Sequence, residues 1–485
     1  MGSLRSLVWF RGKDLRVHDH AALHLAAQDS RELIPVFVLS PEYFGPGGTE
    51  RAPNRLRFVI ESLRELAQNL ADRGSRLLIV HGPAGRVIPH LASALRVDRV
   101  LAIRSGEPAS RSRDERIRAR LSVPFVTCLQ ETLLDPEGVR TGAGGVFRVY
   151  SPFARACNIQ LEAQTPLAAP RRLPPLPAEA QLTAAKEVEL PELASVGLAE
   201  SADVLRGGER AARQRLKHFL AGPIAHYAHD RDRMDLPGTS RLSADLRFGT
   251  LSVRAVWAAL AAQPDLPEAD RSRFFAELLW REFAHYTLWH DPRVLSAPFR
   301  PEFRAFPWRA ANADFEAWWQ GTTGYPVADA SARQLLSQGA VDNRARMISA
   351  SFLTKHLLVH YQHGEAHYLR YLTDGDPAQN NMGWQWSAGC GCDAQPYFRV
   401  FNPVTQGERF DPEGAYVRRH VPELARLPAR YIHAPWTAPA TVLRQAGVRL
   451  GDNYPEPIVD HAAARKRFLL VAADHLKRGT GHAHT

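Results

Sequence analysis

The sequence predicts an α/β domain, a doubly wound parallel sheet, followed by a larger all-α domain. Between residues 6 and 130, short apolar runs alternate with longer stretches of helical periodicity. Beyond Asp203 the pattern is helical throughout. Strands that alternate with helices are typical of parallel sheets covered by helices on both faces.

The expected strands are buried apolar runs too short for helices. They lie at residues 7–10, 33–39, 77–80 and 100–103. Residues 55–72 carry apolar side chains at helical spacing, and Gly74 follows as a stop signal. The turn after the first run lacks the glycine fingerprint of dinucleotide sites, although a ligand can still bind at the carboxyl ends of the strands.

Three regions follow from these patterns. We expect an α/β domain at 1–130, an interdomain linker at 131–200 and a helical domain at 201–485. The linker loses periodicity and holds five prolines between Pro166 and Pro177. Eight of the ten tryptophans lie between Trp257 and Trp386, so we place the functional residues in the helical domain.

Charge and cysteine content limit the classes of function. Lys and Arg number 61 against 51 Asp and Glu, which gives a net charge of +10 and favours a polyanionic partner if the cations share one face. An arginine-rich proteome explains the excess equally well. Four cysteines form no disulfide framework and indicate a reducing, cytoplasmic compartment. Cys390-Gly-Cys392 is a poor zinc pattern, so we expect no metal.

No apolar run reaches transmembrane length, and the amino terminus has no signal-peptide core. We therefore expect no membrane association. The first six residues match a loose myristoylation pattern, which we attribute to chance.

Residues 371–387 are expected to form a loop-like segment that binds a ligand. Asp-Gly-Asp-Pro at 374–377 prevents a continuous helix, because proline lacks an N–H and glycine tolerates positive φ. Asn380 can donate and accept hydrogen bonds, and Trp384 and Trp386 offer flat apolar faces. A capping turn followed by core tryptophans is the alternative.

Residues 238–243 (Gly-Thr-Ser-Arg-Leu-Ser) precede a helical pattern. Hydroxyls and free N–H groups at a helix start can hold a phosphate. Thr and Ser at such a position are more often plain helix caps.

A second polar stripe is expected on a helix over 273–290. Glu277, Trp280, Arg281 and Ala284 share one face at spacings of three and four residues. An acid, an indole and a guanidinium on one stripe suit binding. A surface Glu277–Arg281 pair, worth only about 0.3–0.5 kcal/mol, is the equally weighted alternative.

Residues 342–354 repeat this arrangement. Asn343, Arg346, Met347 and Ala350 fall on one face, and Arg344 leaves at another angle, free for a phosphate. A purely structural stripe would be Leu or Val, so this polarity favours a binding role.

Together these motifs resemble the photolyase/cryptochrome family over nearly the whole chain, most of all the bacterial photolyases of the class I type that repair cyclobutane pyrimidine dimers. The motifs that carry the resemblance stand in order at residues 7–19, 238–243, 279–283, 324–329, 343–347, 374–376, 380–386 and 396–403.

The resemblance implies an FAD held by the helical domain. Its implied contacts are Tyr227, Thr239, Ser240, Arg241, Leu242, Ser243, Phe274, Arg281, Arg346, Asp374, Gly375, Asp376 and Asn380. Arg346 is expected to pair with Asp374, and Asn380 to face N5 of the flavin. Plant cryptochromes usually place Asp, and animal ones Cys, where this chain has Asn380, which favours repair.

The resemblance also implies a pocket for a dimer flipped out of the duplex, because photolyases act on bases that are flipped out of the stack. Its implied lining is Glu277, Trp280, Asn343, Met347 and Trp386, and the implied phosphate contacts are Arg231, Arg344 and Arg399. Because (6-4) photolyases use histidines where this chain has Asn343 and Met347, the cyclobutane dimer is the better substrate. Light-excited reduced FAD would donate an electron to the dimer, with Glu277 stabilising the resulting radical anion.

One position departs from the family pattern. Photoreduction in the family commonly uses three tryptophans, and here Trp384 and Trp308 flank Tyr361 in the middle position. Tyrosine is harder to oxidise unless a proton acceptor is present, so we expect weak photoreduction. A second antenna chromophore, a folate, deazaflavin or flavin, is possible, and no choice follows from the sequence.

The implied partner is UV-damaged DNA, and a monomer is expected. Two other functions stay open: a cryptochrome-type blue-light photoreceptor that signals through partners, and an FAD-binding DNA protein without catalysis.

Overall fold

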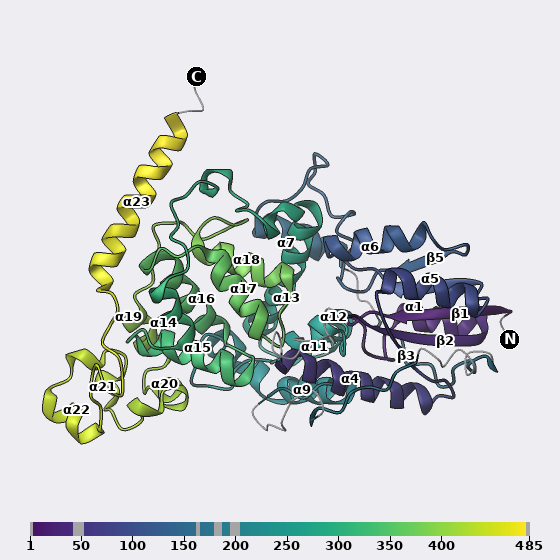
Figure 1. Ribbon diagram of the computed structural model, residues 1–485, viewed down its shortest axis with the longest axis horizontal. Coiled ribbons are helices and arrows are strands. Elements are labelled where there is room, and N and C mark those ends of the chain that lie inside the picture. Colours follow the sequence, from purple (N-terminus) through teal and green to yellow (C-terminus); the bar gives the residue numbers. More distant parts are fainter. Residues whose placement is uncertain (1–2, 42–52, 162–164, 179–186, 195–203, 482–485) are drawn as a thin grey trace. The chain divides into compact units, whose positions relative to one another are not determined.

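The computed structural model describes residues 3–41, 53–161, 165–178, 187–194 and 204–481 (Figure 1). Two compact units make up the chain. The sheet unit comprises Met1–Ala225, Ser240–Pro292 and Thr373–Gly375. The helical unit comprises His226–Thr239, Arg293–Leu372 and Asp376–Thr485. Met1 and Gly2 of the amino-terminal myristoylation pattern lie outside the described residues.

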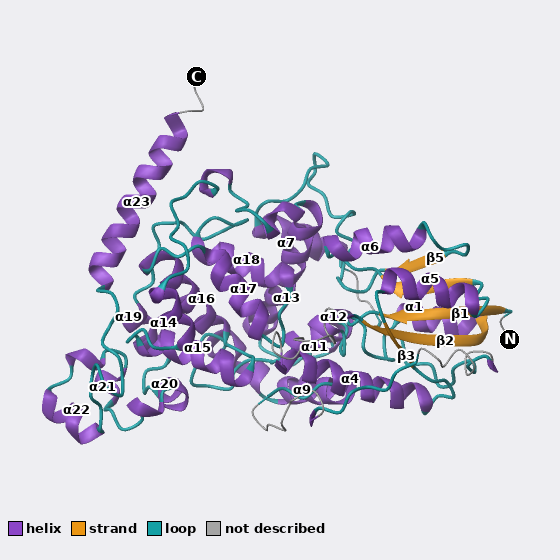
Figure 2. Cartoon of the chain, in the orientation of Figure 1, coloured by secondary structure: helices purple, strands orange, loops and turns teal. Residues whose placement is uncertain are grey.

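Five parallel strands form the sheet, in the order β3-β2-β1-β4-β5 (Figure 2). They are β1 (Leu4–Phe10), β2 (Ser30–Leu39), β3 (Leu78–His81), β4 (Arg99–Ile103) and β5 (Phe125–Cys128). The predicted fold class is confirmed, and the four expected strands are present. The fifth, β5, was not expected from the sequence.

Helices cover both faces of this sheet. Val8 and Phe10 of β1 pack with α1 (Ala21–Asp29) and α4 (Pro53–Ala71). Leu7 and Trp9 point the other way and pack with α5 (Ala84–Ala94) and α6 (Pro108–Arg118). This alternation follows from the two-residue period of a strand, and both faces are buried as a parallel sheet requires.

The sheet unit continues into helices α7 (Tyr150–Gln160), α9 (Glu209–Ala221), α11 (Ser243–Phe248), α12 (Val253–Ala261) and α13 (Glu268–His290). Helix α7 lies inside the expected linker, and its Phe153 packs against Phe283 and Tyr286 of α13. Part of the expected linker is therefore packed structure. The predicted domain boundaries stay a prediction, and residues 195–203 around the second boundary lie outside the described part.

The helical unit contains the larger part of the expected functional domain. Its α-helices are α10 (Tyr227–Asp230), α14 (Ala313–Gln320), α15 (Pro326–Gln338), α16 (Asn343–Ser351), α17 (Tyr361–Tyr371), α18 (Pro377–Ala388), α19 (Pro403–Phe410), α20 (Ala415–His420), α21 (Ala429–Ile432), α22 (Ala440–Ala446) and α23 (His461–Gly481). A π-helical turn, η6 (Phe352–His356), follows α16. Short 3-10 turns complete it: η3 (Pro223–His226) and η4 (Pro292–Leu295), which each begin in the sheet unit, η5 (Pro301–Phe303), η7 (Pro422–Leu424) and η8 (Pro435–Thr437).

The loop expected at 371–387 is wrong for most of its length. Helix α17 ends at Tyr371, and α18 begins at Pro377 after a short turn. Asp376 caps α18 and Pro377 occupies its first turn, where a missing N–H costs nothing. Trp384 and Trp386 therefore lie on a helix.

None of the described helices is long and apolar enough to cross a membrane.

Candidate functional site

Asn380 on α18 is oriented by its neighbours on α17. Its Nδ2 donates to the carbonyl oxygen of Glu365 at 3.0 Å. The Glu365 carboxylate accepts from Asn381 Nδ2 at 3.0 Å, and burial raises the pKa of Glu365 to about 7. Asn380 Oδ1 makes no hydrogen bond to any described residue. The amide is thus held with its acceptor available, as the expected contact to a protonated N5 requires.

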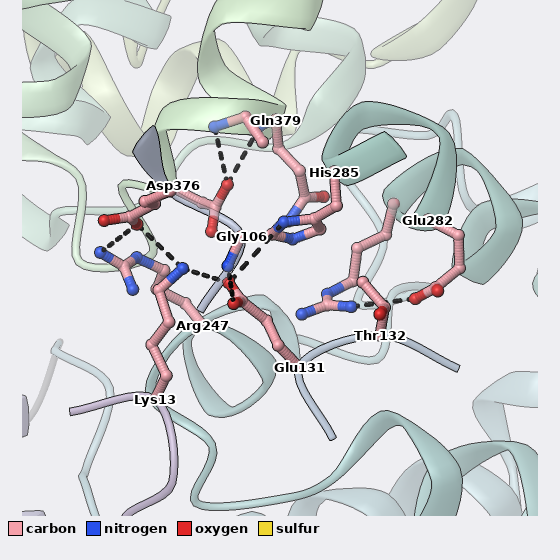
Figure 3. A network of polar contacts seen from close by, with 12 residues as sticks. Lys13, Gly106, Glu131, Thr132, Arg247, Glu282, His285, Asp376 and Gln379 are labelled. Atoms are coloured by element: carbon pink, nitrogen blue, oxygen red, sulfur yellow. Dashed lines mark hydrogen bonds and ion pairs between the residues drawn. The ribbon is translucent and has the colours of Figure 1, made fainter. Parts of the chain in front are cut away.

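Asp376 closes the first turn of α18 (Figure 3). Its Oδ1 accepts from the backbone N–H groups of Ala378 at 2.9 Å and Gln379 at 3.1 Å. The capping alternative is therefore correct for Asp376, whose side chain is almost fully buried.

The expected pairing of Arg346 with Asp374 stays a prediction. Within the helical unit, Arg346 Nε donates to the carbonyl oxygen of Val341 at 2.7 Å. Within the sheet unit, Gly375 next to Asp374 accepts from Arg247 Nε at 3.1 Å.

Residues 240–243 lead into α11 without capping it. The N-cap is Leu242, which has no capping side chain, so the cap alternative for this segment is wrong. Ser240 Oγ accepts from the N–H of Leu242 at 3.4 Å, and Arg241 has a φ of 53°. A non-glycine residue at positive φ is uncommon and is concentrated at ligand-binding segments. In the helical unit, Tyr227 is buried and Thr239 half-buried.

The ion pairs on α13 differ from the expected pair. Glu277 lies 3.7 Å from Arg273, and Arg281 pairs with Glu282 at 3.1 Å, so the predicted Glu277–Arg281 pair is wrong. Burial raises the pKa of Glu282 to about 7 despite its contact with Arg281. Phe274 is buried in the core on the same helix.

Trp280 is stacked on an aromatic residue that the sequence did not indicate. The ring of Tyr150 on α7 lies 3.8 Å from that of Trp280, with 4° between the planes. Tyr150 also donates its hydroxyl to the carbonyl oxygen of Ala276 at 2.9 Å. One face of the indole is thus already occupied, and its orientation is fixed. Nothing in the local sequence relates two residues so far apart in the chain.

The polar stripe on α16 forms as expected. Asn343 Nδ2 lies 3.5 Å from Met347 Sδ, so the two side chains share a face. The expectation that Arg344 is free is wrong. It pairs with Asp232 at 2.9 Å and lies 4.2 Å above the ring of Phe410.

The other two expected phosphate contacts differ in exposure. Arg231 is buried, with Nε 3.7 Å from Asp232. Arg399 is exposed, and its carbonyl oxygen accepts from the Nζ of the buried Lys355 at 2.8 Å. Trp386 is half-buried.

The three residues of the expected electron path all lie in the helical unit. Trp384 is buried and contacts Trp318 edge-on at 5.8 Å. Tyr361 is fully buried, stacks on His360 at 4.8 Å, and its hydroxyl finds no hydrogen-bond partner among the described residues. Trp308 is half-buried and lies 5.9 Å from His360.

A buried charge network joins segments of the sheet unit (Figure 3). Lys13 pairs with Glu107 at 2.9 Å and with Glu131, and the N–H of Gly106 donates to Glu131 at 2.7 Å. Burial alone would raise the pKa of Glu131, but Lys13 and His285 lower it to about 2. Glu131 is therefore ionised at neutral pH. No sequence pattern predicted this network.

A cavity of about 720 Å³ lies at the carboxyl ends of β1, β2 and β4. The strand order reverses direction there, between β1 and β4, where open α/β sheets commonly bind ligands. The aromatic lining residues include Phe10, Phe37 and Phe248. The basic lining residues are Arg11, Lys13, Arg55, Arg86, Arg104, Arg113, Arg116, Arg120 and Arg247. The buried Ser105 Oγ in the lining has no hydrogen-bond partner in the described part of the chain.

Several buried polar atoms among or next to the expected flavin contacts lack partners within the described ranges. They include Arg281 Nε on α13 and Thr373 Oγ1, whose residue precedes Asp374. Buried polar groups normally form hydrogen bonds, so these orphan atoms and the available acceptor of Asn380 fit a polar cofactor. In the same described ranges, no three His, Cys, Asp or Glu side chains are grouped to hold a metal ion.

Comparison with known proteins agrees with these features. Residues 6–174 match the family model described as DNA photolyase, and residues 274–473 match that of the FAD binding domain of DNA photolyase. A deoxyribodipyrimidine photo-lyase of Agrobacterium fabrum is 39% identical, covering 96% of this chain and 97% of the relative. One from Thermus thermophilus is 38% identical, covering 99% and 100%.

Solved structures give the same result. A bacterial class III photolyase from Agrobacterium tumefaciens has a TM-score of 0.90 at 37% identity, covering 98% of each chain. A Synechocystis cryptochrome has a TM-score of 0.85 at 28% identity, covering 96% of this chain and all of that one. Near-complete coverage at these identities shows that the chain belongs to the photolyase/cryptochrome family, with an FAD-binding helical domain.

Proposed function

We propose that the protein repairs cyclobutane pyrimidine dimers in DNA, using light. The observation that carries the proposal is the orientation of Asn380, whose Nδ2 is held by Glu365 while Oδ1 stays available as an acceptor. An acceptor at this position suits a reduced flavin protonated at N5. Relatives that cover almost the whole chain are named deoxyribodipyrimidine photo-lyases, which supports the same activity.

The bound FAD would supply the chemistry by donating one electron to the dimer after light absorption, and the protein would supply binding and orientation. Phe274, Arg281, Asp374, Asp376 and the segments around Tyr227 and 239–243 would hold it. Asn380 would keep the proton at N5 by accepting its hydrogen bond. The orphan Nε of Arg281 is a donor suited to a flavin or phosphate oxygen.

Trp280 and Trp386 would receive the extruded dimer, with Asn343 and Met347 beside it. Tyr150 fixes the plane of Trp280 before DNA binds, which reduces the entropy lost on binding. Glu277 would hydrogen-bond the dimer carbonyls. Arg399, which is exposed, is the proposed phosphate contact that is accessible without breaking an ion pair.

The test is illumination of the chemically reduced protein with an oligonucleotide that contains one cyclobutane dimer. We expect loss of the dimer in light and none in the dark, with a (6-4) photoproduct in the same sequence left unchanged. Binding without loss of the dimer would support a non-catalytic DNA-binding protein. A light-induced flavin response without affinity for damaged DNA would support a photoreceptor.

The cavity in the sheet unit is the proposed site of an antenna chromophore. Its aromatic lining residues suit a planar ring, and its basic lining residues suit an anionic tail. Arg86, Arg116 and Arg120 have no carboxylate partner among the described residues. A Sulfolobus tokodaii photolyase, 28% identical with a TM-score of 0.82, was solved with two FAD molecules and an implied light-harvesting cofactor.

Reconstitution with matched ligands tests this site and its preference. Riboflavin and riboflavin 5′-phosphate differ only in the phosphate, and methenyltetrahydrofolate carries a carboxylate tail. We expect Arg116→Gln to weaken binding of the phosphate-bearing ligand, with little effect from Arg118→Gln, which lies outside the cavity lining. Equal binding of all three ligands by wild type and both variants would refute the site.

A further inference from the structure

Lys355 is a fully buried cation on the π-helical turn η6. Its Nζ donates to the carbonyl oxygen of Arg399 at 2.8 Å and lies 5.8 Å from the ring centre of Phe468 on α23. No carboxylate in the described part of the chain pairs with it. Burying an ammonium group without a counter-ion is costly, so its retention calls for a specific role. Single π-turns are also frequently found at functional sites.

The carbonyl that Lys355 holds belongs to the connection between α18 and α19, residues 389–402, which we name the 389–402 loop. Cys390 anchors the start of the loop, since its carbonyl oxygen accepts from the N–H of Arg300 at 2.9 Å. Near its end, Phe398 is 60% exposed and Arg399 is also exposed. A large exposed aromatic beside an exposed cation suits contact with DNA, where rings stack on bases and guanidinium groups bind phosphates.

We infer that Lys355 is a positioning residue, which sets the DNA-binding conformation of the 389–402 loop by holding the Arg399 carbonyl with a charged hydrogen bond. This inference rests on the proposed function, because it takes Arg399 as a DNA contact. Lys355 itself is buried and does not reach DNA. It acts on the loop backbone, so that the Arg399 and Phe398 side chains are presented in one arrangement.

Charge on Lys355 is sensitive to pH. Burial lowers its pKa to about 7, and the charge of Arg399 adds to that shift. Cys390 and His356 beside it stay neutral between pH 6 and 9, because burial raises the pKa of Cys390 above this range and lowers that of His356 to about 3. The charged hydrogen bond is therefore strongest below pH 7 and weakens as pH rises through it.

The test compares Lys355→Met with Lys466→Met, which removes an exposed lysine from α23. We expect Lys355→Met to weaken binding of dimer-containing DNA by about tenfold, as loss of a charged hydrogen bond allows. The repair rate at saturating DNA and the flavin absorbance should be unchanged. Wild type and Lys466→Met should both lose affinity for dimer-containing DNA as pH rises from 6 to 8.5. Lys355→Met should lose less affinity over the same range.

Two further measurements separate positioning from direct contact or a general structural role. The slope of log Kd against log salt concentration reports the number of phosphate contacts. This slope should be unchanged in Lys355→Met and should decrease in Arg399→Ala by the amount expected for about one phosphate contact. Lys355→Met should have little added effect when Arg399 and Phe398 are both replaced by Ala, because Lys355 acts through these two side chains. Additive effects would overturn the inference, and so would affinity equal to that of Lys466→Met.

If Lys355→Met fails to retain flavin, Lys355→Gln, which keeps a neutral donor, replaces it. Loss of flavin from both variants would mean a core role and refute the inference. Wild type that binds dimer-containing DNA without repairing it would refute the proposed function alone, since the affinity comparison would still stand.

Discussion

The indole of Trp280 lies flat against the phenol ring of Tyr150, with 3.8 Å between ring centres and 4° between planes. Replacing Tyr150 with Ala should weaken binding of dimer-containing DNA, because Trp280 loses the stack that orients it. Such a stack is worth about 0.5–1.5 kcal/mol, or up to about tenfold in Kd. Binding titrations of the reduced protein in the dark would measure this.

Tyr150→Phe is the matched control. It keeps the ring and loses the hydrogen bond to the Ala276 carbonyl, so its Kd should stay within about twofold of wild type, since such a bond contributes little in net terms. Equal Kd values for Tyr150→Ala and wild type would mean that the stack does not support lesion binding.

Gly364 on α17 is required by its contact with Trp384. A Cβ at this position would overlap Cη2 of the Trp384 ring. Overpacking in Gly364→Ala should therefore lower the free energy of unfolding by about 1–3 kcal/mol. The higher helix propensity of alanine offsets about 1 kcal/mol of this loss. Chemical denaturation of the FAD-free protein would measure the difference.

Gly383→Ala provides the comparison, because nothing lies within 4 Å of a Cβ at that position on α18. It should leave stability unchanged or raise it by up to about 1 kcal/mol. If both variants lose stability equally, the approach of Trp384 is not the cause of the loss in Gly364→Ala.

The sequence predicted the elements whose signal is local. Buried runs such as 33–39 identify strands, and the helical period of 55–72 identifies α4. Strand β5 was not predicted, because it forms no continuous apolar run at this edge of the sheet. Its Val126 is 37% exposed. Helix α18 was not predicted because Asp-Gly-Asp-Pro indicates a loop, whereas Pro377 fits the first turn of a helix.

Long-range relationships were beyond sequence reasoning. Tyr150 meets Trp280 only because α7 packs on α13, and Lys355 lies near Phe468 only because α23 packs on η6. The stripe of Asn343 and Met347 was predictable, since helical spacing alone brings them together. Ion pairing was not, because several partners lie within reach of each charge.

Glu365 predicts a pH dependence of stability. Burial raises its pKa to about 7, so the folded state binds more protons than the unfolded state between about pH 4.5 and 7. The stabilisation from this group is therefore present at low pH and is lost as pH rises through 7. Glu365→Gln removes that dependence, so its stability relative to wild type should improve from pH 5 to pH 8, by at most about 3 kcal/mol.

Denaturation of the FAD-free variants at the two pH values measures this effect. Glu316→Gln is the control, because the Glu316 side chain is exposed. Its stability relative to wild type should be the same at pH 5 and pH 8. A Glu365→Gln difference that is the same at pH 5 and pH 8 would mean that the carboxylate is ionised throughout.

Tyr361 predicts slow photoreduction of oxidised FAD. Oxidising a phenol is easiest when its proton can leave, yet the Tyr361 hydroxyl is buried without a described partner, and burial raises its pKa. Tyr361→Trp should therefore speed photoreduction under blue light by at least about tenfold, a barrier change of about 1.4 kcal/mol.

Tyr361→Phe, which cannot carry the hole, should match wild type. Repair by dithionite-reduced protein should be the same in all three. Fast photoreduction of wild type that Tyr361→Phe abolishes would show that the tyrosine is a competent relay and that its proton finds an acceptor.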